Sequence, residues 1–151
     1  PDYILKQLQD LKLGMTSGGK EGRMDPVMSA MAMPLSEQDM KDLAAYFSSM
    51  NMTEGATPKD VVEVGEMLFK AGDAERGIPS CAACHGPRGN GSSLAKFPKI
   101  SFQHPGYIKS QLEKFRDGTR HNDLNGMMGD IAKKLTDKDI EVLSQYLGGL
   151  H

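Results

Sequence analysis

The sequence has no tryptophan and few aromatic residues, which make up 6% of its 151 positions. Hydrophobic residues of all kinds reach 38%, and small chains bury only a modest share of their surface on folding. A chain of this length forms one ordinary domain or two small ones. Two small domains with so few large apolar side chains would need a large apolar cofactor to complete their cores.

Long hydrophobic runs are also missing. No segment approaches the roughly 20 apolar residues that a membrane-spanning helix needs, so the sequence predicts no membrane span, and peripheral association with a membrane stays open. The formal net charge is −2, which gives no strong attraction to nucleic acid or to an anionic membrane. We therefore expect proteins, and no nucleic acid, as partners.

Cysteine is nearly absent, because Cys81 and Cys84 are the only two. They cannot form a disulfide-rich framework, but with His85 they complete Cys-x-x-Cys-His, the signature of covalent haem attachment. Two thiols one helical turn apart can each add to a vinyl group on one porphyrin edge, and His85 then offers its imidazole to the iron. A structural zinc site would need further Cys or His ligands, and a thioredoxin-like pair would follow a strand. The sequence shows neither.

Methionine, by contrast, is abundant, with 11 residues. A haem iron that passes electrons without binding small molecules needs its sixth position filled, and a thioether ligand raises the reduction potential. The second half of the chain offers Met127 and Met128. We predict Met128 as the ligand, because only Met128 has a counterpart, Met28, in an internal repeat. Packing in the core is the alternative role for either residue.

The internal repeat relates the start of the chain to its end. Residues 1–8 resemble residues 105–112, and residues 28–36 resemble residues 128–136. The offset between the copies falls from 104 to 100 along the way. The first copy is therefore expected to carry extra loop residues in the glycine-rich stretch 14–22.

The first copy is only half as complete as the second. Residues 58–104 have no counterpart near the start of the chain. We therefore predict that residues 1–50 are the back half of a first domain, 51–57 a linker, and 58–151 a complete domain.

The coarse pattern is all-helical, since no segment alternates convincingly as a strand. The predicted helices cover residues 58–72, 105–117, and the segment that Thr136 caps, with the last two repeated over 1–13 and 36–49. At the first of these helices, Thr57 and Asp60 are predicted to form a capping box, with Pro58 at the first helical position.

A glycine inside the helix 58–72 predicts a close helix crossing. Gly65 costs about 1 kcal/mol relative to alanine at such a position, so close approach of another helix is a reasonable cause. We expect Gly65 and Phe69 to cross the last helix at Leu143 and Tyr146. The alternative is a tolerated glycine on the surface.

Taken in order, the motifs of residues 58–151 resemble the second domain of the c4-type dihaem cytochromes. The matching motifs are Cys81-Ala82-Ala83-Cys84-His85-Gly86-Pro87-Arg88-Gly89-Asn90-Gly91, Phe97-Pro98-Lys99-Ile100, Tyr107, Gln111-Leu112, Phe115-Arg116-Asp117-Gly118-Thr119-Arg120, Asn122-Asp123 and Met127-Met128. The resemblance implies two class I cytochrome c domains in tandem, and a backbone carbonyl near Pro98 that holds the proximal histidine.

The same resemblance implies the function. These cytochromes are periplasmic carriers of single electrons on covalently bound haem c with His/Met ligation. Their partners would be a quinol-oxidising complex upstream and a terminal oxidase downstream. The alternative is a cytochrome subunit of a dehydrogenase complex that oxidises sulfide or an alcohol. A haem enzyme such as a peroxidase needs an open coordination position, and Met128 argues against it.

The chain departs from this family in its first domain, which lacks its own helix and its own Cys-x-x-Cys-His. One haem c can attach here, at Cys81 and Cys84. We expect a preceding segment of roughly 40 residues to complete the first domain in the native protein and to bring a second haem c. Met28 would be the distal ligand of that haem. The rival is a first domain that has lost its haem.

Overall fold

The computed structural model describes residues 1–150. Within that range there is no β-strand, and no helix is long and apolar enough to cross a membrane. In chain order, the elements are α1 (Asp2–Thr16), α2 (Pro26–Ala32), α3 (Glu37–Ser48), α4 (Lys59–Ala71), α5 (Ala82–His85), α6 (Pro105–Asp117), η1 (Leu124–Gly126), α7 (Met127–Ala132) and α8 (Asp137–Gly148). The all-α prediction is confirmed.

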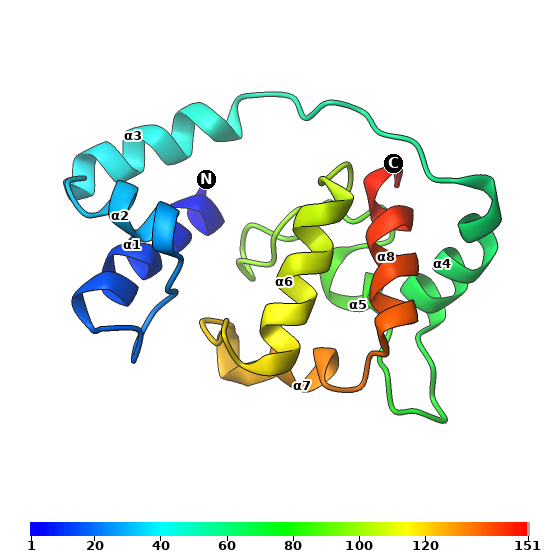
Figure 1. Ribbon diagram of the computed structural model, residues 1–151. Helices are drawn as coiled ribbons and strands as arrows, with labels where there is room; N and C mark the ends of the chain where they lie inside the picture. Colours follow the sequence, from blue (N-terminus) through cyan, green and yellow to red (C-terminus); the bar gives the residue numbers. More distant parts are fainter. Residues whose placement is uncertain (151) are drawn as a thin grey trace.

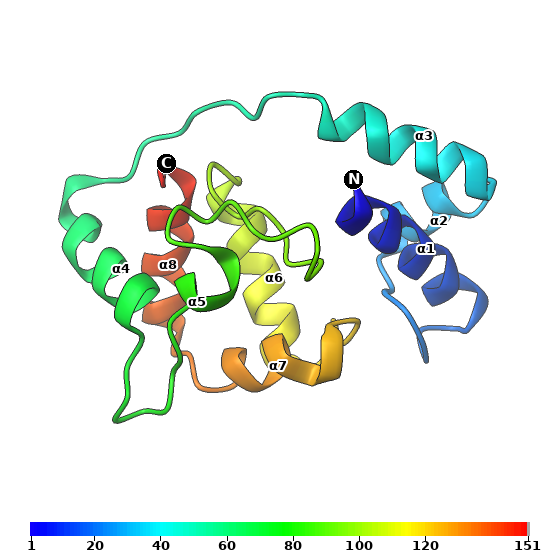
Figure 2. The same cartoon turned by 180° about the vertical axis from the view of Figure 1, so that it is seen from behind.

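The helices lie in two groups, α1–α3 and α4–α8, as Figure 1 and the view from behind in Figure 2 both show. In the first group, α1 packs against α2 and α3. In the second, α4 packs against α8, and α6 against α7 and α8. The segment between α3 and α4 runs as an extended connection from one group to the other (Figure 1). The two groups contain the two copies of the sequence repeat.

The second group has a continuous apolar core, in which α4 and α8 cross at Gly65. A Cβ atom at Gly65 would lie 2.6 Å from the Cβ of Tyr146, so only glycine permits this approach. The rings of Phe69 and Tyr146 have centroids 5.7 Å apart. The predicted crossing is therefore confirmed. Buried residues of this core include Leu68, Phe69, Ile78, Ile108, Leu135, Ile140, Leu143, Tyr146, Leu147 and Leu150.

Matching caps begin α3 and α8. The Ser36 hydroxyl accepts from the Asp39 backbone N–H at 3.1 Å, and the Asp39 carboxylate accepts in return from the Ser36 N–H at 2.9 Å. Thr136 and Asp139 make the same two bonds at 3.1 and 2.8 Å. Each pair is a capping box, which satisfies N–H groups that a helix start leaves free. The repeat thus extends from sequence to local hydrogen bonding.

The first group buries much less apolar surface than the second. Its buried hydrophobic side chains are Leu11, Ala32, Met40 and Ala44. Large apolar residues of the same helices are exposed, including Val27, Met28, Met31, Tyr46 and Phe47. The first group therefore has a small core and a wide apolar surface.

The loop that follows α1 differs from its counterpart after α6 in more than length. The Arg23 N–H donates to the Asp10 carbonyl at 2.8 Å, and the Arg120 N–H to the Lys114 carbonyl at 2.9 Å. Asp10 and Lys114 are related by the repeat, so Arg23 and Arg120 occupy equivalent places. The first copy has extra residues before its arginine, as predicted, and the second has extra residues after its arginine, which include η1.

The predicted capping box at the start of α4 is wrong. Pro58 is the N-cap residue and no side chain caps this helix. The Thr57 hydroxyl instead donates to the Tyr146 carbonyl at 2.9 Å, which fastens the connection to the end of α8. The Thr57 hydroxyl, which a local capping box would use, is therefore engaged in a tertiary hydrogen bond.

Candidate haem centre

His85 is the last residue of α5, a single helical turn that directly follows Cys81. Its side chain is 8% exposed, and its Nδ1 atom lies 3.0 Å from the carbonyl oxygen of Pro98. A carbonyl only accepts, so Nδ1 carries the hydrogen and Nε2 keeps its lone pair. Burial lowers the pKa of His85, and the hydrogen bond to Pro98 opposes that shift. A neutral imidazole with Nε2 free is the form that binds a metal.

The loop between His85 and Pro98 is folded tightly enough to return the chain to the imidazole. The Gly91 N–H donates to the His85 carbonyl at 2.8 Å, and Ser92 and Phe97 exchange backbone hydrogen bonds of 3.0 and 2.9 Å. Gly91 has a φ of 73°, and a Cβ atom there would lie 2.4 Å from the carbonyl oxygen of Phe97. The predicted Pro98 contact is confirmed, and it fixes the ring tautomer, as partners of metal-binding histidines commonly do.

The two thiols differ in their surroundings. Cys81 is half-buried against the core of the second group, whereas Cys84 is exposed. Burial raises the pKa of Cys81 to about 11. A thioredoxin-like pair would follow a strand, and residues 1–150 contain no strand, so the structure gives that alternative no support. Among residues 1–150 no three His, Cys, Asp or Glu side chains lie close enough together to bind a metal ion. The alternative of a structural zinc site therefore has no set of ligands in this part of the chain.

Met127 and Met128 open α7, in the same helix group as His85. Met127 is 36% exposed and Met128 is half-buried. The backbone enters α7 through Gly126, whose φ is 70°, and the Asp123 carboxylate accepts from the Gly129 N–H at 3.0 Å. These contacts fix the start of the helix, and with it the position of both thioethers. The donor set of two thiols, a neutral imidazole and a thioether fits haem c.

Met28 lies on α2 beside a cavity of 350 Å³ in the first group. Its side chain is 46% exposed. The cavity is lined mainly by apolar side chains of α1 and α3, with Met28 on one wall. Three polar residues, Gln7, Arg23 and Asp25, and Tyr107 of α6 also line it. The first copy therefore offers an apolar recess with a thioether on one side and a guanidinium on another.

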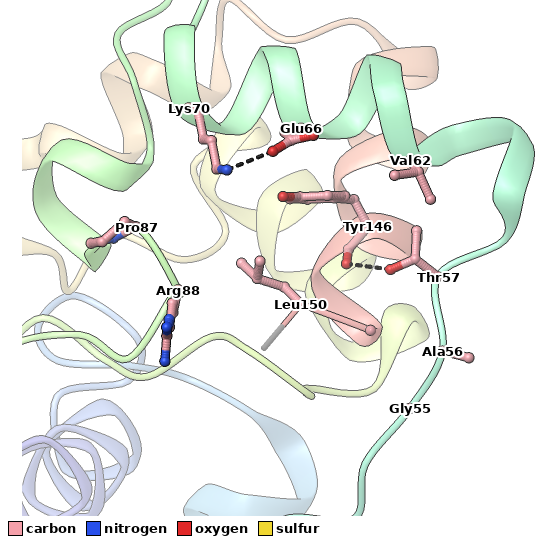
Figure 3. A pocket seen from close by; sticks show the side chains of 11 residues that line it. Gly55, Ala56, Thr57, Val62, Glu66, Lys70, Pro87, Arg88, Tyr146 and Leu150 are labelled. Carbon is pink, nitrogen blue, oxygen red and sulfur yellow. Dashed lines mark hydrogen bonds and ion pairs between the residues drawn. The ribbon is translucent and has the colours of Figure 1, made fainter.

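A larger cavity of 640 Å³ lies elsewhere, between the connection, α4, α8 and the loop after His85 (Figure 3). The Glu66–Lys70 ion pair, Arg88 and the Tyr146 ring line it. None of the cysteines, His85 or the candidate methionines belongs to its wall. It is not the haem site.

Sequence reasoning missed two arginines that connect the two groups of helices. Arg23 of the first copy and Arg120 of the second meet between α1 and α6, where both donate to Gln7 and to Gln111. The sequence contains a signal for this contact. Gln7 and Gln111 each lie in phase with the apolar face of their helix, and both are buried. A buried glutamine in that register predicts a polar partner from another element.

Comparisons with known proteins identify the family of the chain. The sequence model of the cytochrome c family matches residues 62–151. Cytochrome c4 of Stutzerimonas stutzeri is 48% identical over 99% of this chain and 72% of its own length. The crystal structure of reduced recombinant cytochrome c4 from Pseudomonas stutzeri superposes with a TM-score of 0.95 at 45% identity, covering 99% of this chain and 80% of that one.

A relative with a different name is also similar. A thiosulfate dehydrogenase electron acceptor of Stutzerimonas stutzeri is 36% identical over 98% of this chain and 66% of its own length. Its name describes a protein that receives electrons from an enzyme, as a cytochrome can. The fold, the Cys-x-x-Cys-His motif and these relatives together place the chain in the cytochrome c family, among the c4-type cytochromes, which transfer electrons on covalently bound haem c.

Proposed function

We propose that this protein carries single electrons in the periplasm on a haem c bound to Cys81 and Cys84, with His85 and Met128 as the axial ligands of the iron. The observation that carries the assignment is the 3.0 Å hydrogen bond from His85 Nδ1 to Pro98, because it leaves Nε2 free in a buried, neutral ring. The chain acts as a carrier and not as an enzyme, since a thioether in the sixth position leaves no site for a substrate.

The side chains have two tasks in such a carrier, which are to hold the ligands and to exclude water. Haem c supplies a metal that gains and loses one electron while its ligands stay in place. His85 is held by Pro98, so its ring does not rotate when the charge changes. The core behind Cys81, formed by α4, α6 and α8, excludes water from one side. Exclusion of water and fixed ligands both reduce the rearrangement that accompanies electron transfer.

The substitution Met128→Ala tests the distal ligand. Removal of the thioether should abolish the weak near-infrared sulfur-to-iron band, lower the reduction potential and let carbon monoxide bind the ferrous protein. Met127→Ala is the matched control, because it removes the neighbouring thioether from the same helical turn and should preserve all three properties. The opposite pattern would assign the ligand to Met127.

For the first copy, we propose that residues 1–50 are the back half of a second haem domain, separated by residues 51–57 from the domain 58–151. Met28 would be the distal ligand of its haem. Two features support this assignment. The 350 Å³ cavity beside Met28 is largely apolar, and α2 with Met28 corresponds in the repeat to α7 with Met128. The attachment cysteines and proximal histidine would come from chain that precedes residue 1 in the whole protein.

The proposed partners are a quinol-oxidising complex as donor and a terminal oxidase as acceptor. A second candidate function is that of a cytochrome subunit, or immediate acceptor, of a dehydrogenase. The similarity to a thiosulfate dehydrogenase electron acceptor favours this candidate. Stable co-elution with a flavoprotein or thiosulfate-oxidising subunit would select it, whereas a free carrier should purify alone and be reduced by a quinol-oxidising complex.

A further inference from the structure

The 640 Å³ cavity between the connection, α4, α8 and the loop after His85 has no part in the electron-transfer function (Figure 3). Its volume lies within the range of about 300–1,000 Å³ that small-molecule sites occupy in proteins. The wall combines apolar and charged side chains with one phenol, that of Tyr146. The apolar side chains include Val62, Pro87 and Leu150, and the charged ones are Glu66, Lys70 and Arg88.

The hydroxyl of Tyr146 is an unsatisfied polar group in this wall. The side chain is only 6% exposed, because its ring packs over Gly65 and against Phe69. Its hydroxyl end points into the cavity (Figure 3) and has no hydrogen-bond partner among residues 1–150. Buried polar groups are nearly always hydrogen-bonded, so the partner of this phenol comes from outside the polypeptide.

The phenol of Tyr146 keeps its hydrogen at neutral pH. Burial and the negative charge of Glu66 raise the pKa of Tyr146, and the positive charge of Lys70 only partly opposes them. A protonated phenol can donate a hydrogen bond to an anion. The hydroxyl therefore presents a donor, and no negative charge, to a molecule in the cavity.

Arg88 is an exposed cation of the same wall that lacks a counter-charge. In the part of the chain that the structure describes, its side chain forms no ion pair and no hydrogen bond. The sequence around it supplies no carboxylate, because no Asp or Glu lies between Glu75 and Glu113. Glu66, the carboxylate of the wall, is paired with Lys70 at 2.5 Å. Two cations and one carboxylate leave a surplus of one positive charge, which favours a ligand with one negative charge.

The rim that the connection contributes is fixed on the end of α8. The Thr57 hydroxyl donates to the Tyr146 carbonyl at 2.9 Å. A Cβ atom at Gly55 would lie 2.2 Å from the carbonyl oxygen of Gly148, and one at Gly149 would lie 2.1 Å from the Thr57 nitrogen. This close packing forms the rim before any ligand arrives. A preformed wall reduces the cost of ordering the protein on binding.

We propose that this cavity binds a small organic monocarboxylate, whose carboxylate group accepts hydrogen bonds from Arg88 and from the Tyr146 hydroxyl. The planar guanidinium of arginine matches the geometry of a carboxylate. The apolar part of the ligand contacts Val62 and Leu150, which an inorganic anion would leave unused. The site goes beyond the proposed electron-transfer function and shares no residue with the candidate haem ligands, so each of the two assignments can fail without the other.

The experiment is isothermal titration calorimetry of the haem-loaded protein with benzoate and, separately, with hexanoate. These probes carry one carboxylate on an aromatic and on an aliphatic body, and at least one of them should bind saturably with one molecule per chain. Benzamide, which has the shape of benzoate without the charge, should not bind, and inorganic phosphate should bind more weakly. Arg88→Gln and Tyr146→Phe should each weaken binding of the carboxylate by about tenfold or more, because each removes a hydrogen bond to a charged group.

Two matched variants make the test specific. Arg116→Gln removes an arginine charge outside the cavity, where Arg116 donates to Asp137. Tyr107→Phe removes a phenolic hydroxyl outside the cavity, which accepts from Arg23. Both should bind the carboxylate as the wild type does. Without ligand, Tyr146→Phe should be at least as stable as the wild type in urea unfolding, because its hydroxyl has no bond to lose.

Four results would overturn the proposal. One is that neither benzoate nor hexanoate binds saturably. Another is that benzamide or phosphate binds as tightly as the carboxylates, since the charge or the apolar part would then be irrelevant. The third is an equal loss of affinity in Arg116→Gln and Arg88→Gln, which would reveal a general effect of charge. The last is a clear loss of stability in ligand-free Tyr146→Phe, which would give the hydroxyl a structural role.

Discussion

At the scale of single residues, Asp139 makes more interactions than Asp39, its equivalent in the other copy. Both Asp39 and Asp139 close a capping box, but Asp139 also binds Arg76 through two bonds of 2.6 and 3.2 Å. Burial by itself would raise the pKa of Asp139, and the hydrogen bonds from Arg76 and Thr136 outweigh it and lower the pKa to about 2. An ordinary aspartate in an unfolded chain titrates near 3.9.

This difference predicts a pH-dependent contribution to stability. A depressed pKa adds stability above the unfolded value and loses it as pH falls through the folded value. Asp139→Asn should therefore lower the free energy of unfolding by about 1–2 kcal/mol at pH 7. The cost should shrink between about pH 4 and pH 2. Urea unfolding followed by circular dichroism and haem absorbance over that range measures it.

Asp39→Asn is the control for this prediction. It removes the carboxylate from an equivalent capping box that has no arginine, so it should cost less than Asp139→Asn at pH 7. An Asp139→Asn penalty that stays constant from pH 7 to pH 2 would contradict the role given to the carboxylate charge.

Sequence reasoning was most reliable for residues whose role depends on their neighbours along the chain. Thr136 was predicted as a cap and Ser36 as the start of the equivalent helix, and both are N-cap residues with a capping box. Thr57 was predicted as a cap on the same local logic, and it failed because its hydroxyl meets the Tyr146 carbonyl, far away in sequence. A local pattern does not indicate which tertiary acceptor will compete for a hydroxyl.

At the scale of elements, the crossing of α4 over α8 depends on a missing side chain. Gly65→Ala would place a Cβ atom 2.6 Å from the Cβ of Tyr146. Overpacking of this kind costs about 1–3 kcal/mol, which exceeds the ~1 kcal/mol that alanine gains in a helix. We expect a net loss of stability in urea unfolding and a weaker near-infrared band as the helices separate.

The matched control is Gly106→Ala, in the first turn of α6. A Cβ atom there would meet nothing within 4 Å, so this variant should be as stable as the wild type or slightly more stable. Equal stability of the two alanine variants would mean that α4 and α8 can move apart without cost.

The short helices α2, α5 and α7 were not predicted, whereas the long ones were found close to their true ends. Helices of four to seven residues show too few turns for an apolar period to be visible. They are held by caps and tertiary contacts, such as the bonds from Asp25 to the backbone of Val27 and Met28. The candidate axial methionines lie on two of these three helices, so the sequence identified the residues but not the elements that position them.

At the scale of the whole molecule, the repeat predicts the haem content of the native protein. The first group of helices exposes Met31, Tyr46 and Phe47 and encloses a 350 Å³ cavity beside Met28. A native preparation should contain two irons per protein, both with His/Met spectra, and Met28→Ala should alter only one of them. The attached haem gives the internal reference, because its spectrum should be unchanged. A single iron in the native protein would show that the first copy has lost its haem.

The contact between the groups was beyond sequence reasoning, although its parts were visible. Tyr3 and Gln7 were recognised as repeats of Tyr107 and Gln111, but nothing in the pattern says that the two copies face each other. The equivalence of Arg23 and Arg120 could not be read from the sequence alignment of the two copies. Insertions on different sides of the two arginines change the offset between the copies there. Only three-dimensional equivalence, through the bonds from their N–H groups to α1 and α6, reveals them as a pair.

The hydrogen bond from the Thr57 hydroxyl to the Tyr146 carbonyl, at the end of α8, reduces the entropy lost when the two helix groups come together. Because this bond ends the free part of the connection at Thr57, nine positions after the last residue of α3, Ser48, a short tether keeps the two groups close to each other. A short tether gives an effective concentration in the millimolar range. Hydrogen bonds that involve a charged group, such as those from Arg23 and Arg120 across the two groups, contribute about 1.5–3 kcal/mol each, whereas two separate molecules would lose about 4–15 kcal/mol in translational and rotational freedom on association. The tether makes the association unimolecular, so a contact built mainly from polar side chains, without a large apolar interface, is sufficient to keep the copies in register.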